Sequence, residues 1–312
     1  MATLIGVLCS GRRHGYTAGL LDAALESAAE VEGVQVDRVA LHDYTFGPCK
    51  SCFECIRRED HVCILKDDMG HEGQGVLFGK VAAANALLIA DPVHNWGPTA
   101  TCHLLIERLY PFLWSGALGG LPFAGISCAS NQGMHRLARA NLCKWAFGYG
   151  MRYVGGVAAH CAYYEEACNE TRRLGRELAQ AALADERDGR RPLTDLDRFL
   201  SYVGSPWVAF EPYLDNLTSG TGEWDQSLMY RGLSQGTFQR PEARELLEQS
   251  LTDLRRALTL RRLGDLEGAT RALVEASAAW THATWKEFLE EDVIKAKQPE
   301  AYRPLGGPRT ED

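Results

Sequence analysis

Short apolar runs alternate with helical patterns over the first 185 residues, and this alternation restricts the fold more than any other feature. The runs occupy residues 4–9, 34–41, 85–90, 122–128 and 152–159. Helical segments between them carry apolar residues every three or four positions. Short apolar strands separated by helices are typical of a parallel sheet covered on both faces. Because crossovers are right-handed, we expect an α/β fold with an open, doubly wound, five-stranded parallel sheet.

The pattern changes after residue 184. Residues 185–192 are charged and contain Gly and Pro, which is typical of a linker. Two helical segments, 241–262 and 265–291, then predict an antiparallel helical pair. The chain therefore divides into a first domain at residues 1–188 and a mainly helical C-terminal extension at residues 189–312. The first domain carries an insertion at about residues 47–66.

Composition excludes several classes of protein. Hydrophobic residues make up 46% of the 312 residues and charged residues 24%, which are globular values. The net charge of −8 argues against nucleic-acid or anionic-membrane partners. No apolar run approaches the roughly 18 residues of a membrane helix. Residues 1–16 do not resemble a secretory signal, so we expect a cytoplasmic protein whose ten cysteines form no disulfide scaffold.

The loop at residues 10–17 joins the first expected strand to the first helix. Backbone amides at a helix start favour an anion, and Ser10, Arg12 and Thr17 add hydroxyl and charged donors. The loop matches neither the P-loop nor the dinucleotide fingerprint, so a mononucleotide phosphate fits better. An ordinary capped turn is the alternative reading of the same residues.

Four of the ten cysteines lie close together in the insertion. Cys49, Cys52 and Cys55 are separated by two residues each, and Cys63 follows after seven more. Thiolates suit zinc or iron–sulfur iron. Two successive two-residue gaps also begin the ferredoxin pattern, whereas zinc usually takes two separated pairs. The spacing favours a 4Fe-4S cluster, with a zinc site or unliganded thiols as alternatives.

Together, these motifs give the chain a family resemblance. It resembles the iron–sulfur flavoprotein branch of the flavodoxin-like NAD(P)H-dependent FMN reductases. Four stretches carry the match: residues 10–17, Cys49 to Met69 with its Lys-Asp-Asp-Met end, Asp91 to Gly97 followed by Glu107-Arg108, and Ala129 to Gly133. The chain departs from the family pattern by lacking a Pro in the first loop and by having His94 where Tyr is usual.

The resemblance implies a strand order of 2-1-3-4-5, bound FMN, a 4Fe-4S cluster on the four cysteines, and a homo-oligomer, dimer or tetramer, whose interface holds the flavin. It implies that the FMN phosphate contacts Ser10, Arg12, His14, Tyr16 and Thr17. It implies that the flavin ring contacts Pro92, Val93, His94, Asn95, Trp96 and Gly97, with further contacts from Ser130, Asn131 and Gly133.

A flavin exchanges two electrons and a cluster exchanges one, so the pair converts between the two kinds of chemistry. We therefore expect an FMN-dependent oxidoreductase that moves electrons from a reduced donor, NAD(P)H or a ferredoxin, to a small-molecule substrate. His94 is the candidate acid or base, with a stacking wall as its other interpretation. Two other functions stay open: a flavin-only quinone, nitro or azo reductase without a cluster, and a non-enzymatic electron carrier between protein partners.

Overall fold

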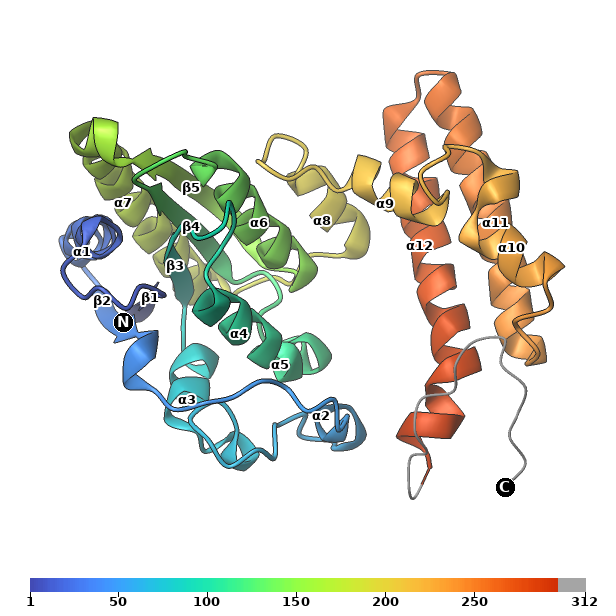
Figure 1. The fold of residues 1–312 in the computed structure, drawn as a ribbon, viewed down its shortest axis with the longest axis horizontal. Coiled ribbons are helices and arrows are strands. Elements are labelled where there is room, and N and C mark those ends of the chain that lie inside the picture. The colour runs from blue at the N-terminus through green and yellow to red at the C-terminus, as the bar shows by residue number, and fades with distance from the viewer. Residues whose placement is uncertain (297–312) are drawn as a thin grey trace. The chain divides into compact units, whose positions relative to one another are not determined.

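The computed structural model describes residues 1–296 and divides the chain into two compact units, Met1–Trp207 and a second unit that begins at Val208. The first unit contains one parallel sheet in the order β2-β1-β3-β4-β5 (Figure 1). Its strands are β1 (Ala2–Leu8), β2 (Val34–Ala40), β3 (Ala86–Pro92), β4 (Pro122–Ala129) and β5 (Arg152–His160). The predicted doubly wound sheet and its strand order are confirmed.

Helices cover both faces of this sheet (Figure 1). One face packs against α1 (Tyr16–Ala29) and α7 (Tyr164–Asp188). The other face packs against α3 (Val76–Ala82), α4 (Ala100–Arg108), α5 (Tyr110–Ser115) and α6 (His135–Gly148). Helices α1 and α7 approach closely because Gly175 has no side chain: a Cβ there would lie 2.1 Å from the Ala24 carbonyl oxygen. Burial on both faces explains why β1, β3 and β4 are continuous apolar runs.

Smaller elements complete the first unit. They are α2 (Glu54–Arg57) and α8 (Asp195–Ser201), with short 3₁₀ turns at Leu41–Asp43, His71–Gly73 and Cys161–Tyr163.

The first unit continues past Asp188, where the sequence placed the domain boundary. Phe199 and Tyr202 are 4% and 1% exposed and pack edge-on against the ring of Phe147 in α6. The Tyr202 hydroxyl donates to the Met151 carbonyl at 2.6 Å. These contacts favour a boundary after Trp207, because the segment between the two positions belongs to the core of the first unit.

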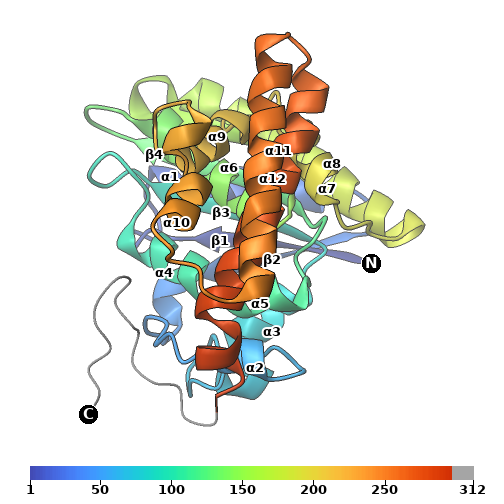
Figure 2. The same ribbon diagram turned by 90° about the vertical axis from the view of Figure 1, so that its right-hand side faces the viewer.

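The second unit is helical, as the sequence predicted. It contains α9 (Phe210–Leu217), α10 (Leu228–Ser234), α11 (Pro241–Arg262) and α12 (Leu266–Phe288), with a 3₁₀ turn at Trp224–Gln226 and a π-helical turn at Glu290–Ile294. Figure 2 shows α11 and α12 side by side as the expected pair. Asp265 begins α12 by accepting the amide of Gly268 at 2.9 Å. Among the helices described, none has the length and apolar character needed to span a membrane.

Candidate functional site

The loop after β1 leads directly into α1. Gly15 precedes the helix, no side chain caps its first amides, and its first turn carries no acidic residue. These N–H groups are therefore available to an anion. Ser10 holds the loop by accepting the Arg12 amide at 3.1 Å, and Thr17 is buried beside the Cys128 thiol.

The predicted phosphate ligands all lie on this loop and the first turn of α1. Arg12, His14 and Tyr16 are exposed, whereas Ser10 and Thr17 are buried. All five lie on the eight residues that lead into the uncapped start of α1, and such a helix start fits a phosphate.

The loops after β3 and β4 meet at the same edge of the sheet. Trp96 donates its indole N–H to Gln132 Oε1 at 3.0 Å. His160, the last residue of β5, contacts the Asn131 carbonyl through Nε2 at 2.9 Å. The predicted ring contacts at 92–97 and 130–133 are therefore neighbours, as loops at the carboxyl edge of a parallel sheet should be.

His94, the candidate acid or base, is exposed within this group. Its backbone forms two hydrogen bonds with Gly97, at 2.9 and 3.0 Å, which close the loop tightly. The loop bends through Asn95 and Trp96, whose φ angles are 47° and 67°. The catalytic role of His94 stays a prediction.

Asp91 begins the 91–97 stretch noted in the sequence, where it was given no role, and it lies under the 92–97 loop. It is 1% exposed, and its carboxylate oxygens accept the amide and hydroxyl of Thr99 at 2.9 and 2.6 Å. Burial raises the pKa of Asp91 to about 7, although the Thr99 hydrogen bonds oppose this shift. The Cys9 and Cys102 thiols lie within 4.8 Å of the carboxylate. A charged residue directly after the apolar run 85–90 is the sequence signal that could have drawn attention to it.

The four predicted metal ligands line a single cavity of about 350 Å³, whose wall also includes Tyr110 and Tyr149. Cys55 is buried and the other three cysteines are half-buried. Burial, followed by the charges of the other three thiols, raises the pKa of Cys55 to about 11. The structure therefore brings all four cysteines to the wall of one largely apolar cavity.

The C-terminal end of α4 holds this cysteine segment. Glu107 accepts the Cys49 amide at 2.6 Å. Arg108 donates to the Gly47 carbonyl at 2.6 Å and to the Cys63 sulfur at 3.4 Å. It also forms a bidentate pair with Asp67, at 2.6 and 2.8 Å. Burial opposes ionisation of Asp67, yet the bonds and charge of Arg108 keep its pKa below the ordinary value.

The arrangement of the four cysteine sulfurs can be compared with what zinc and an iron–sulfur cluster require. Four sulfurs around one zinc ion, at about 2.3 Å each, would lie about 3.8 Å apart. Within residues 1–296, no three of these four sulfurs come within 4.8 Å of one another. The Ser51 amide donates to the Cys49 sulfur at 3.4 Å, as N–H groups do around iron–sulfur clusters. The four thiols are therefore a donor set that could hold iron–sulfur iron, with the Ser51 amide donating to one of the sulfurs.

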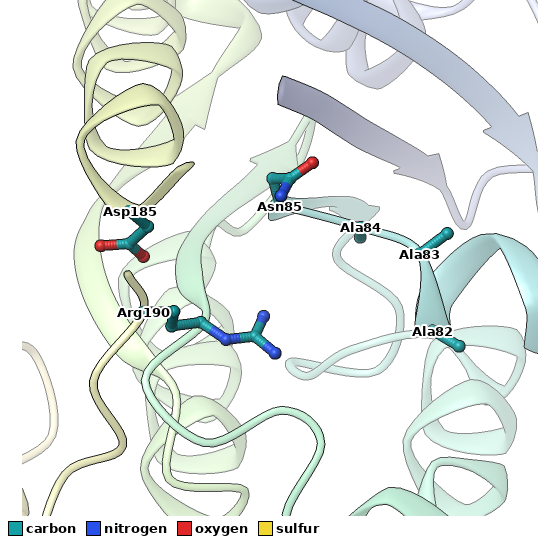
Figure 3. Close-up of a pocket in the computed structure, with 6 residues that line it drawn as sticks. All are labelled: Ala82, Ala83, Ala84, Asn85, Asp185 and Arg190. Carbon is teal, nitrogen blue, oxygen red and sulfur yellow. The ribbon is translucent and has the colours of Figure 1, made fainter. Parts of the chain in front are cut away.

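A separate cavity of about 270 Å³ lies in the first unit (Figure 3). It is lined by Ala82, Ala83, Ala84, Asn85, Asp185 and Arg190. None of these is a predicted site residue, and Asp185 is paired with Arg152 at 2.9 Å.

The sheet order and the anion-accepting start of α1 define a flavodoxin-like α/β protein. The sequence profile described as NADPH-dependent FMN reductase matches residues 2–165, more than half of the chain. The chain therefore belongs to the NADPH-dependent FMN reductase family, which makes it an FMN-dependent oxidoreductase and confirms the family resemblance found in the sequence.

Individual relatives are more distant. The iron-sulfur flavoprotein of Archaeoglobus fulgidus is 25% identical over 186 residues, which cover 57% of this chain and 79% of that protein. Among solved structures, a flavone reductase is 16% identical with a TM-score of 0.45, covering 62% of this chain and 66% of its own. The apo form of an NADH:FMN oxidoreductase is 17% identical with a TM-score of 0.45, covering 62% and 95%.

Proposed function

We propose that this chain is an iron–sulfur flavoenzyme that passes electrons from a reduced donor, NAD(P)H or a ferredoxin, through FMN and a 4Fe-4S cluster to a small-molecule substrate. The observation that carries the proposal is the single cavity lined by Cys49, Cys52, Cys55 and Cys63 in a unit with the FMN reductase fold. The name of the Archaeoglobus relative supports it. All ten cysteines are unpaired, which fits a reducing compartment such as the cytoplasm.

The flavin side of the proposal assigns roles to residues at the carboxyl edge. The amides at the start of α1 would hold the phosphate, with hydroxyls from Ser10 and Thr17. The loops 92–97 and 130–133 would hold the ring, fixed relative to each other by the Trp96–Gln132 hydrogen bond. Bound FMN supplies hydride and single-electron chemistry, and the protein contributes orientation and electrostatics.

The cluster side uses the cavity and its hydrogen bonds. Four thiolates would hold the iron, and the aromatic wall of Tyr110 and Tyr149 would keep water away. The amide of Ser51 and the guanidinium of Arg108 would donate to sulfur and favour negative charge on it.

We include a homo-oligomer, dimer or tetramer, in the proposal. Large apolar side chains on the elements after β1, β3, β4 and β5 are 40–59% exposed: Tyr16, Trp96, Met134, Leu137 and Tyr163. A second copy that covers them would also shield the flavin loops. Analytical ultracentrifugation tests this part: a strictly monomeric holoprotein contradicts it.

Anaerobic purification followed by an ultraviolet–visible spectrum and assays of iron, sulfide and FMN per chain tests the central proposal. Cys52→Ser should lose the broad cluster absorbance and keep FMN. Cys143→Ser, a matched change at a buried cysteine of α6, should keep both. Full iron content in Cys52→Ser, or wild-type protein that binds neither group after reconstitution, contradicts the assignment.

The match to the NADPH-dependent FMN reductase family also supports one alternative, a flavin-only NAD(P)H-dependent reductase. Wild-type protein with FMN but no iron, and with rapid NAD(P)H turnover on quinone, nitro or azo acceptors, would establish this function instead. Turnover of such acceptors without any protein partner also distinguishes the iron–sulfur flavoenzyme and the flavin-only reductase from a non-enzymatic electron carrier.

A further inference from the structure

Arg108 is a buried cation that contacts a candidate cluster ligand. Its side chain is 1% exposed, and it comes from the last turn of α4. One guanidinium nitrogen, Nη1, bonds Gly47 and Asp67, and the other, Nη2, bonds Asp67 and the Cys63 sulfur. A charge removed from water needs such partners, so the position of Arg108 is strictly determined.

Asp67 balances this charge at close range. Because Nη2 bonds both groups, Asp67 Oδ1 lies no more than about 6 Å from the Cys63 sulfur. The Asp67 side chain is 15% exposed, so solvent screens it only in part. The sulfur therefore lies beside two opposite charges, with the guanidinium in direct contact and the carboxylate farther away. Removing either one leaves a unit charge of known sign beside the sulfur.

We propose that the Arg108–Asp67 pair sets the reduction potential of the cluster bound through Cys63, with Arg108 favouring the reduced state and Asp67 opposing it. The inference rests on the proposed function. The step is a one-electron reduction: the electron comes from the reduced donor, no covalent bond changes, and the added negative charge falls on iron and sulfur. A nearby cation stabilises that charge and a nearby carboxylate destabilises it.

Both residues are positioning residues, and a purely structural role makes a different prediction. If the pair only fastened the segment between Gly47 and Asp67 to α4, removing either partner would loosen the same contacts. Both changes would then move the potential in the same direction or leave it unchanged. An electrostatic role requires shifts of opposite sign.

The test is a spectroscopically monitored anaerobic redox titration of the full-length, cluster-loaded protein and two variants. Asp67→Asn should increase the ratio of reduced to oxidised cluster at a fixed potential, and Arg108→Gln should decrease it. A unit charge at about 6 Å and an effective dielectric near 20 changes such a ratio on the order of a hundredfold. We set tenfold in each direction as the threshold, which is 59 mV for one electron. Arg152→Gln breaks an ion pair between β5 and α7 and should leave the ratio unchanged.

Shifts in the same direction, or shifts below tenfold, overturn the inference. If Arg108→Gln does not retain iron, Asp67→Asn and Arg108→Lys decide together, and Asp67→Asn must still raise the ratio. Arg108→Lys keeps the charge but loses the bidentate geometry. Its ratio of reduced to oxidised cluster must therefore stay closer to the wild-type ratio than that of Asp67→Asn does. Wild-type protein without a cluster refutes the proposed function and this inference together. A wild-type cluster without opposite shifts refutes the inference alone.

Discussion

Truncation at two positions tests where the first unit ends. Chain 1–207 keeps the segment that packs on α6, and chain 1–188 loses it. Burial of Phe199 and Tyr202, at 4% and 1% exposure, contributes roughly 2–3 kcal/mol each, and the hydrogen bond from Tyr202 to Met151 about 1 kcal/mol. Ordering the segment costs conformational entropy, so the net loss of stability is smaller than this sum. We therefore expect 1–188 to be less stable by about 3 kcal/mol, which lowers Tm by about 6–12 °C in a domain of this size.

Thermal unfolding followed by circular dichroism, with flavin fluorescence recorded in parallel, measures both chains. Chain 1–207 carrying Tyr202→Phe is the matched control: it keeps the ring packing, loses one hydrogen bond and should fall by about 1 kcal/mol. Equal Tm values for 1–188 and 1–207 would show that the packing of Phe199 and Tyr202 on Phe147 contributes nothing, and would return the boundary to Asp188.

Two further changes probe the carboxyl edge of the sheet. Thr17→Val keeps the volume of a buried side chain but removes its hydroxyl. The Kd for FMN, measured by fluorescence titration, should therefore rise about tenfold, which equals about 1.4 kcal/mol. An unchanged Kd would show that Thr17 does not contact the phosphate. Burial raises the pKa of Asp91 to about 7, above its ordinary 3.8, so the neutral carboxyl stabilises the fold below about pH 4 and this contribution is lost as the pH rises to about 7. In Asp91→Asn, the unfolding free energy should no longer depend on the pH over that range. Above pH 7 it should exceed the wild-type value by up to about 4 kcal/mol. Urea unfolding measures this, and a profile that still follows wild type from pH 4 to 8 contradicts the reasoning.

The sheet could be predicted from the sequence because its central strands β1, β3 and β4 are buried on both faces and must be apolar along their length. The cysteine cavity could be predicted because ligand spacing is local: Cys49, Cys52 and Cys55 lie on one short stretch of chain. Both signals come from residues close together in the sequence, which is the range over which periodicity and spacing carry information.

The missed features depend on contacts between distant residues. Arg108 and Asp67 are 41 positions apart, and nothing near either one shows that they form a buried pair. Phe199 and Tyr202 follow a charged stretch that is typical of a linker, so only the position of Phe147 explains their burial. The raised pKa of Asp91 likewise arises from burial and not from its neighbours in the chain.

Helix α4 connects the two candidate cofactor sites of the first unit. At its start, Thr99 binds Asp91 beneath the 92–97 loop, and at its end Glu107 and Arg108 bind the cysteine segment. Nine helical residues span about 13 Å, so a rigid element of that length fixes one site relative to the other. All of these contacts lie within Met1–Trp207, so chain 1–207 contains every residue that we propose to hold the two groups. We predict that the second unit acts in substrate selection: in chain 1–207, turnover of particular acceptors should change while FMN and iron per chain do not. Loss of iron from chain 1–207 would show instead that α4 alone does not secure the cysteine segment.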